Sequence, residues 1–132
     1  SARNQRPLIG DAMYQIDDYQ VLFDSVIIYE APGRVLDYIL YNEDLILVYD
    51  VKDVFDNYEK AIGLEIRNHN VLRVSSSGKE IWKISDCEKA YGFWAIYIKN
   101  KKFYAAGFDD RKHIFDPETG KTLGWGYPSE NN

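Results

Sequence analysis

A short turn motif occurs twice in the chain of 132 residues, and it constrains the fold more than any other feature. The first copy reads SGKEIW over residues 77–82, and the second reads TGKTL over residues 119–123, with Trp125 two places further on. Gly78 and Gly120 are 42 residues apart, which is the length of one four-stranded unit in proteins that repeat small β-sheets. The spacing therefore predicts two similar units of strands.

Short apolar segments separated by turn residues surround both copies of the motif, and this pattern is typical of antiparallel strands. Asn-containing turns at residues 42–44 and 100–102 precede the apolar segments 45–49 and 103–108. About nine such segments predict an all-β fold, mainly antiparallel, either a β-propeller-like meander or an open sandwich. One short helix is expected within residues 52–61, where the strand pattern breaks and Asp53 can cap a helix.

The chain length suits one domain. We expect an irregular segment over residues 1–18 and a single β domain over residues 19–132, in which residues 19–41 add strands beside the two units. Residues 93–98 (FWAIYI) are apolar on both faces, which predicts a central strand covered on each side. Six aromatic side chains in strands are expected in the core: Trp82, Phe93, Trp94, Phe103, Phe108 and Phe115.

The residues that could carry out catalysis or hold a metal form no known motif. Cys87 lies between two carboxylate residues, which disfavour a reactive thiolate. His113 follows two carboxylates, but a histidine in a short strand beside a turn is expected at the surface. The carboxylates at every third position from Asp50 to Asp56 lack the alternating ligands and the glycine of an EF-hand loop. We therefore expect a protein that is not an enzyme, with no catalytic residues, no metal site and no cofactor.

Acidic residues are concentrated in the first half of the chain. Residues 1–66 contain 5 basic and 13 acidic side chains, a net charge of −8, whereas residues 67–132 contain 11 basic and 8 acidic, a net charge of +3. An acidic chain is a poor binder of nucleic acid and a suitable partner for a basic protein. The acidic run is either a solvated surface or a surface that attracts a cationic partner. On the second interpretation, the partner-binding residues are Glu43, Asp44, Asp50, Asp53, Asp56 and Glu59, with Tyr49 and Tyr58 as aromatic anchors.

Several features bear on the compartment. No apolar run reaches the roughly 18 residues that a transmembrane helix needs. No signal peptide is visible in residues 1–10, and a single cysteine gives no sign of an oxidised, secreted scaffold. We therefore expect a cytoplasmic protein with no membrane partner.

The motifs SGKEIWKI at residues 77–84 and FDPETGKTLGW at residues 115–125 resemble the repeat of quinoprotein-type β-propellers, in which a D-x-x-T-G-K turn leads into a strand with Trp. The layout of residues 40–125 also resembles small bacterial toxin-immunity proteins: an Asn turn, a strand ending in Asp, a long loop and two such hairpins. The resemblance implies a blade-like β-meander that binds and neutralises a cognate toxin. It does not imply a quinone cofactor, because the chain is too short for a closed propeller, which needs about four blades.

Many antibacterial toxins are basic nucleases, because they must hold phosphate backbones. An acidic immunity protein would block the active or substrate-binding surface of such a toxin by charge complementarity. Two other functions remain open at this point. One is a blade-like protein-interaction adaptor with no toxin partner, and the other is an enzyme or small-molecule binder that uses the tyrosines of the sheet.

Overall fold

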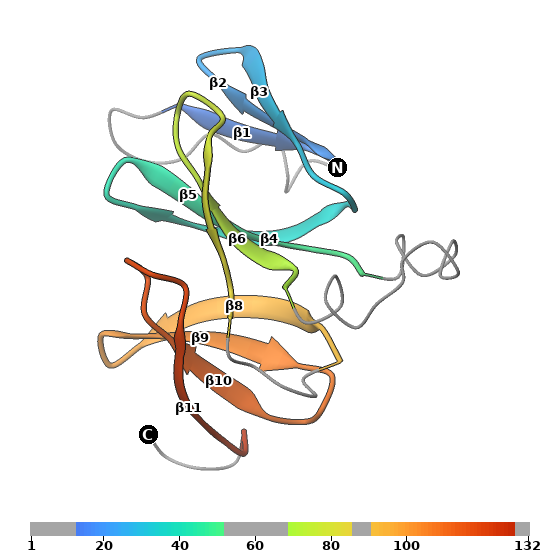
Figure 1. Ribbon diagram of the computed structural model, residues 1–132. Helices are drawn as coiled ribbons and strands as arrows, with labels where there is room; N and C mark the ends of the chain where they lie inside the picture. The colour runs from blue at the N-terminus through green and yellow to red at the C-terminus, as the bar shows by residue number, and fades with distance from the viewer. Residues whose placement is uncertain (1–12, 52–68, 86–90, 129–132) are drawn as a thin grey trace.

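Three antiparallel β-sheets follow one another in a computed structural model that describes residues 13–51, 69–85 and 91–128 (Figure 1). Each sheet is built from strands that are consecutive in the sequence, so that neighbouring strands are joined by short turns. The first sheet contains β1 (Tyr14–Asp17), β2 (Gln20–Phe23) and β3 (Val26–Glu30); the second contains β4 (Val35–Tyr41), β5 (Asp44–Tyr49), β6 (Val71–Val74) and β7 (Glu80–Lys83); the third contains β8 (Phe93–Lys99), β9 (Lys102–Gly107), β10 (Lys112–Phe115) and β11 (Thr122–Gly126).

The second sheet lies between the other two and is buried on both faces. Successive side chains of a strand point to opposite faces, so β5 divides its apolar residues between two cores. Leu45 and Leu47 face the first sheet, where they join a cluster with Ile16 and Val21. Ile46 and Val48 face the third sheet, where they pack in a cluster with Phe93, Ile96, Ala105 and Phe115. The continuous apolar run of β5 is therefore explained by burial on both sides.

The turns that open the two four-stranded sheets have the same backbone conformation. Asn42 and Glu43 have φ values of 46° and 68°, and Asn100 and Lys101 have φ values of 51° and 65°. Two successive residues with positive φ are typical of the type I′ turn of a two-residue hairpin, which favours Asn at its first position. The similarity of the two units that the repeated motif predicts is therefore present in the backbone.

A buried asparagine joins the second and third sheets. Asn70 precedes β6 and is fully buried. Its Nδ2 donates hydrogen bonds to the backbone oxygens of Tyr49 and Phe93, each at 2.7 Å, and its Oδ1 accepts one from the backbone N–H of Phe93 at 3.0 Å. These bonds connect the end of β5 to the start of β8, where backbone groups between two sheets would otherwise lack partners.

The all-β, mainly antiparallel fold expected from the sequence is confirmed. The described residues contain eleven strands rather than about nine, because residues 14–30 form a three-stranded sheet. Part of the segment predicted to be irregular, residues 1–18, is thus a strand: Tyr14–Asp17 form β1, whose apolar side chains cover the second sheet. Residues 1–12 and the predicted helix within residues 52–61 fall outside the described ranges.

Strand β8 differs from the prediction of a central strand. It lies at one edge of the third sheet, beside β9 only, and it faces β4 and β5 of the second sheet. A bulge at Trp94, between Phe93 and Ala95, interrupts the alternation of its side chains. Phe93 is buried, whereas Trp94 and Ile98 are 52% and 50% exposed. Apolar residues on both faces of this strand therefore do not reflect burial on both faces.

Candidate functional site

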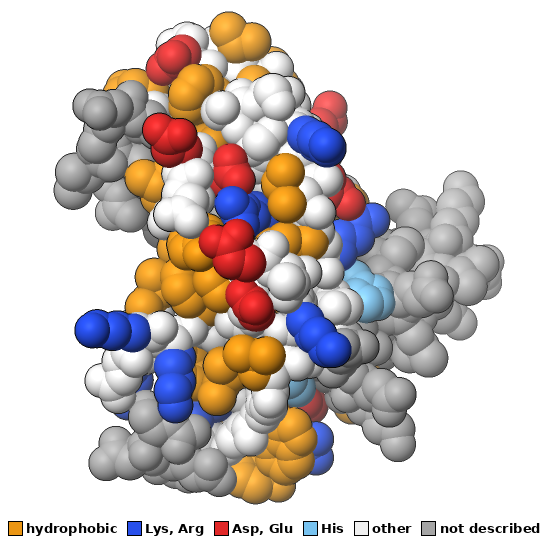
Figure 2. Space-filling view, turned by 60° about the vertical axis from the view of Figure 1, so that its left-hand side comes forward, with side chains coloured by type: hydrophobic (Ala, Val, Ile, Leu, Met, Phe, Trp, Pro, Cys, Tyr) orange, Lys and Arg blue, Asp and Glu red, His pale blue; other side chains and the backbone are white. Residues whose placement is uncertain are grey.

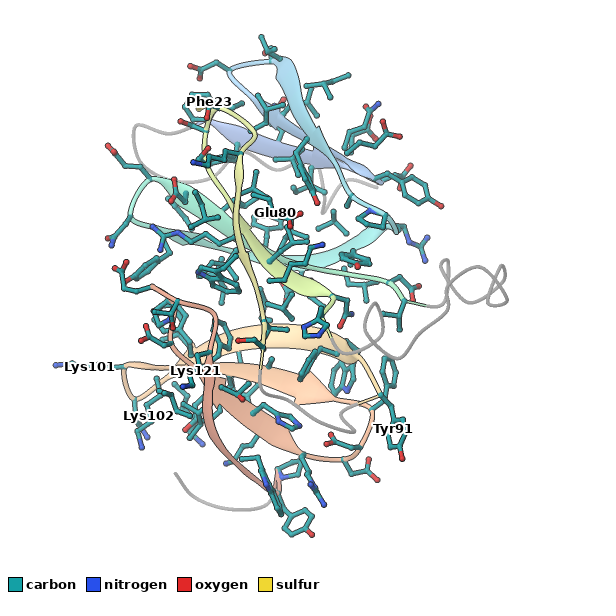
Figure 3. All side chains as sticks on the ribbon, in the orientation of Figure 1. Phe23, Glu80, Tyr91, Lys101, Lys102 and Lys121 are labelled. Atoms are coloured by element: carbon teal, nitrogen blue, oxygen red, sulfur yellow. The ribbon has the colours of Figure 1, made fainter. Side chains whose placement is uncertain are left out.

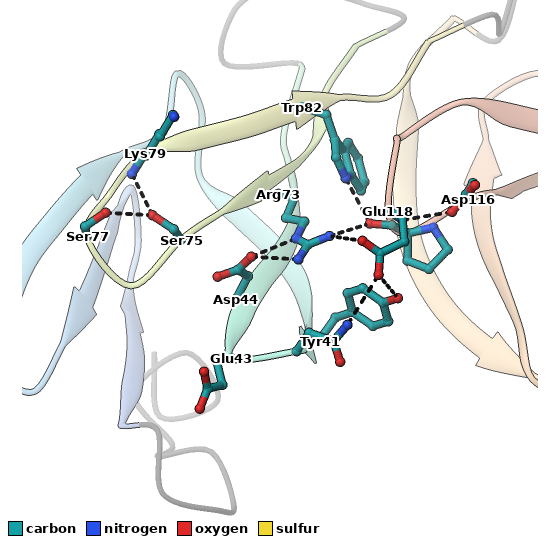
Figure 4. A network of polar contacts seen from close by, with 12 residues as sticks. Tyr41, Glu43, Asp44, Arg73, Ser75, Ser77, Lys79, Trp82, Asp116 and Glu118 are labelled. Atoms are coloured by element: carbon teal, nitrogen blue, oxygen red, sulfur yellow. Dashed lines mark hydrogen bonds and ion pairs between the residues drawn. The ribbon is translucent and has the colours of Figure 1, made fainter.

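An ion pair lies between the second and third sheets, where the β4–β5 turn approaches the β10–β11 turn (Figure 4). Arg73 of β6 places Nε and Nη2 each 2.8 Å from Oδ2 of Asp44, and only a tenth of its side chain is exposed. Its Nη1 donates to the backbone oxygen of Pro117 at 3.0 Å and lies 3.4 Å from Oε2 of Glu118. The guanidinium also lies 5.0 Å from the ring centroid of Tyr41. Arg73 thus holds the β10–β11 turn against the second sheet.

Two further side chains of the second sheet contact the same turn. Trp82 of β7 donates from Nε1 to the backbone oxygen of Pro117 at 2.9 Å. Tyr41 donates from its hydroxyl to Oε1 of Glu118 at 2.7 Å, and this hydrogen bond raises the pKa of Tyr41. The carboxylate of Asp116 accepts from the backbone N–H of Glu118 at 2.9 Å, which shapes the turn. The network is therefore a structural connection between two sheets.

The four described residues of the predicted acidic surface do not form one surface. Asp44 is paired with Arg73, and its side chain is only 18% exposed. Tyr49 is 3% exposed and belongs to the core, so the expectation that it anchors a partner is wrong. Glu43 is exposed in the β4–β5 turn, whereas Asp50 follows the opposite end of β5. Asp53, Asp56, Tyr58 and Glu59 lie outside the described residues.

Replacing Arg73 by methionine tests the strength of this connection. Arg73→Met keeps the apolar stem but leaves Asp44 without its partner in a mostly buried place, and we expect the free energy of unfolding to fall by about 2 kcal/mol. Lys83→Met is a matched control, because Lys83 is half exposed and lies 3.4 Å from Glu80. An exposed pair of this kind contributes roughly 0.5 kcal/mol. Urea unfolding of both variants measures the difference, and equal losses would contradict the assignment.

Two tyrosines are held in their neutral form by burial in the core between the first and second sheets. Burial raises the pKa of Tyr14 to about 12, with Asp44 as a second cause, and burial raises that of Tyr49 to about 12, with Glu80 as a second cause. The Tyr14 hydroxyl donates to the backbone oxygen of Glu43 at 2.6 Å. Ionised tyrosine is therefore disfavoured in the folded protein.

The raised pKa values predict a loss of stability in alkali. Below about pH 10 both states keep their tyrosines neutral, whereas at higher pH the unfolded chain ionises first and is stabilised. The free energy of unfolding should thus fall as the pH rises from about 10 through about 12. Tyr49→Phe should remove roughly 2 kcal/mol of that fall. Urea unfolding across this pH range measures it, and an equal fall in native protein and variant would be evidence against a buried, neutral Tyr49.

A histidine–carboxylate pair lies in the third sheet. His113 of β10 places Nε2 at 2.9 Å from Oδ2 of Asp109, with side-chain exposures of 4% and 7%. The ring of His113 packs edge-on against Phe93, and Oδ1 of Asp109 accepts from the backbone N–H of Arg111 at 3.1 Å. His113 is therefore buried rather than at the surface as the sequence predicts. Its partners are structural, because they close the β9–β10 turn.

Five exposed aromatic side chains lie toward one end of the third sheet, and we call this group the aromatic end. The strand register places Phe93 opposite Gly107, Ala106 opposite Lys112, and Lys112 opposite Gly126, so that residues beside these positions share one end of all four strands. Figure 2 shows hydrophobic side chains exposed at the lower end of the molecule, and Figure 3 labels Tyr91 beside the third sheet. The members are 48–53% exposed: Tyr91, Trp94, Phe108, Trp125 and Tyr127.

Contacts among these residues give the aromatic end a defined shape. The Trp125 and Tyr127 rings meet edge to face with centroids 5.5 Å apart. The guanidinium of Arg111 lies 3.8 Å from the centroid of Trp125, which is a cation–π contact. The backbone N–H of Phe108 donates to the oxygen of Gly92, which brings Phe108 next to Tyr91. Rigid, half-exposed aromatic rings with an arginine are the composition of protein-binding hot spots.

The sequence places two of these residues in the core, and the structure corrects that. Trp82, Phe93 and Phe115 are buried as expected, and Phe103 is partly buried. Trp94 and Phe108 are about half exposed, because Trp94 lies at the bulge of β8 and Phe108 lies in the turn after β9. The signal available in the sequence was the density of aromatic residues near the first and last strands of the third sheet.

The described side chains contain no group of three or more His, Cys, Asp or Glu placed to hold a metal ion. Within the same ranges, no helix has the length and apolar character needed to cross a lipid bilayer.

Comparisons with known proteins show a likeness of fold alone. No protein-family model matches the chain, and a search of curated proteins finds no match. Among solved structures, the crystal structure of the computationally designed Ika8 protein matches with a TM-score of 0.57 and 9% sequence identity. The match covers 90% of this chain and 34% of the designed one, so the chain spans about a third of that protein's length.

Proposed function

We propose that the protein binds another protein through the aromatic end of its third sheet. The observation that supports this is the group of five half-exposed aromatic rings, with Arg111 stacked on Trp125. Trp, Tyr and Arg dominate the binding energy of many interfaces, because they bury large areas at a low cost in conformational entropy. Contiguous exposed apolar side chains on a protein surface commonly mark a site of interaction with another protein.

The partner in this proposal is a cognate antibacterial toxin, and the protein acts as its immunity protein in the cytoplasm. The resemblance of residues 40–125 to such proteins supports this choice, as does the net charge of −5, which suits a basic toxin. The aromatic end would provide slow dissociation, and the acidic residues Asp53, Asp56 and Glu59 would accelerate capture. The same proposal includes the finer architecture, in which the three sheets are consecutive blades of an open, propeller-like meander.

Co-expression with the product of the adjacent gene tests the proposal directly. We expect a stable complex that blocks the activity of that product, and Trp125→Ala combined with Tyr127→Ala should weaken binding by about thirtyfold, as expected for a hot spot of about 2 kcal/mol. Ile81→Ala is the control, because Ile81 is 42% exposed on the second sheet. Reversing the charges of Asp53, Asp56 and Glu59 should slow association and reduce its dependence on salt.

The outcomes separate the parts of the proposal. Unchanged affinity in the double aromatic variant would reject the aromatic end as the contact surface. A chain that forms no complex with the adjacent gene product but retains another protein from the same cells would reject the toxin and favour the adaptor function.

A further inference from the structure

The interfaces between consecutive sheets share one structural feature. A glycine with positive φ in the last turn of one sheet lies directly on the last strand of the preceding sheet. A Cβ on Gly78 (φ 85°) would lie 2.0 Å from the backbone oxygen of Ile28 in β3, and a Cβ on Gly120 (φ 76°) would lie 2.4 Å from the Trp82 ring in β7. This close glycine contact therefore occurs at both interfaces, between the first and second sheets and between the second and third.

The corresponding position on the last strand of the third sheet is open. Trp82 lies four residues after Gly78, and Gly124 lies four residues after Gly120. The register agrees, because Trp82 pairs with Arg73, which pairs with Ile46, and Gly124 pairs with Ile114, which pairs with Tyr104. A Cβ on Gly124 would meet nothing within 4 Å. There is therefore room at Gly124 itself, whereas Tyr104 on the same face is fully buried.

The polar positions around this site carry positive charge. The β4–β5 turn presents Tyr41 and Asp44 to the next sheet, and the equivalent hairpin positions in the third sheet are Lys99 and Lys102, which pair across β8 and β9. Both lysines are exposed, and Figure 3 shows Lys101 and Lys102 extending from the β8–β9 turn.

The first sheet carries the opposite charge on its free side. Residues 13–30 contain four acidic residues and no Lys, Arg or His, and all four are exposed: Asp17, Asp18, Asp24 and Glu30. Asp24 lies in the β2–β3 turn, which corresponds to the turn of Glu118 in the third sheet. Ile27 pairs with Leu22 on the face opposite Val21 and is 54% exposed. The free face of the first sheet is therefore acidic with an apolar centre.

We propose that the protein associates head to tail, with the third sheet of one copy stacked on the first sheet of a second copy. Asp24 of the second copy lies beside Lys99 and Lys102, as Glu118 lies beside Tyr41 and Arg73 within the chain. Tyr97, which is 37% exposed and stacked on Tyr104, supplies an aromatic surface for Ile27. Because the two contacting surfaces differ, the contact is heterologous and can repeat until a ring closes.

Complementary charge variants test this contact by sedimentation velocity. Native protein should associate with increasing concentration, and added salt should weaken the association. Lys99→Glu combined with Lys102→Glu reverses the charge of the contact surface on the third sheet, and Asp24→Lys reverses that on the first. Each variant alone should therefore associate at least about tenfold more weakly than the native protein. A mixture of the two should recover association, because the intact surface of each variant fits the other and the two altered surfaces carry opposite charges. Lys83→Glu on the second sheet is the control.

A third variant makes the test independent of folding defects. The chain that carries Lys99→Glu, Lys102→Glu and Asp24→Lys together reverses the charges on both sides and should recover association. Native protein that stays monomeric up to about 100 µM, well above a typical micromolar contact, would overturn the proposal. Association that none of these substitutions changes would overturn it equally. Toxin binding by the aromatic end is measured separately, so either proposal can fail without the other.

Discussion

The Asn70→Asp variant is expected to lose about 4 kcal/mol of unfolding free energy at neutral pH. In the native protein the Asn70 amide donates to the backbone oxygens of Tyr49 and Phe93, both at 2.7 Å. A carboxylate would place a negatively charged oxygen against these two acceptors, and the position is fully buried. Both carbonyl groups would lose their donor, and the charge would have no counter-ion.

Urea unfolding at several pH values measures this effect. Lowering the pH should restore part of the stability of the variant, because a protonated carboxyl can donate to one of the two oxygens. Asn100→Asp is the matched control, since Asn100 is exposed in the β8–β9 turn and should change stability by no more than about 0.5 kcal/mol. A variant at position 70 that is as stable as the native protein would show that the amide does not connect the sheets.

Gly120→Ala is expected to cost about 3 kcal/mol. The φ of Gly120 is 76°, a conformation that costs an alanine roughly 1 kcal/mol or more. Its Cβ would also lie 2.4 Å from Cε3 and 2.5 Å from Cδ2 of Trp82, so the indole must move. Because the indole N–H of Trp82 donates to Pro117, any movement also weakens the network between the second and third sheets.

Gly124→Ala is the control for this substitution, since it makes the same chemical change two strand positions beyond the turn. A Cβ there meets nothing within 4 Å, and we expect a change within about 0.5 kcal/mol. Thermal and urea unfolding of the two variants give the comparison. If both alanines had the same effect, the close contact between Gly120 and Trp82 would play no part in stability.

Local patterns account for most of the strands that the sequence predicts. The hairpins around Gly78 and Gly120, and those that open at Asn42 and Asn100, occur where the turn residues predict them. Turn chemistry acts over a few residues, so it can be read without knowing the rest of the fold. Strand β1 of the first sheet was not predicted, because it is only four residues long and lies in a segment that was expected to be irregular.

The candidate site was harder to predict, and particular residues show why. Asp44 and Tyr49 lie at opposite ends of β5, and the sequence assigns both to the partner-binding surface. One is buried in the first core, and the other is paired with Arg73, which is 29 residues away along the chain. Trp94 is a large aromatic residue in a strand and is therefore expected in the core, but the bulge in β8 exposes it. Each outcome depends on a neighbour that is distant in sequence.

The chain's own residue pattern determined the all-β class, the antiparallel hairpins and the similarity of the two four-stranded units, because alternation and turn preferences are local properties. Tertiary packing decided which faces of those sheets are covered, and therefore which charges pair and which aromatic side chains reach solvent. The physical reason is that a strand presents two faces by its geometry alone, whereas burial of either face requires another sheet to be stacked on it.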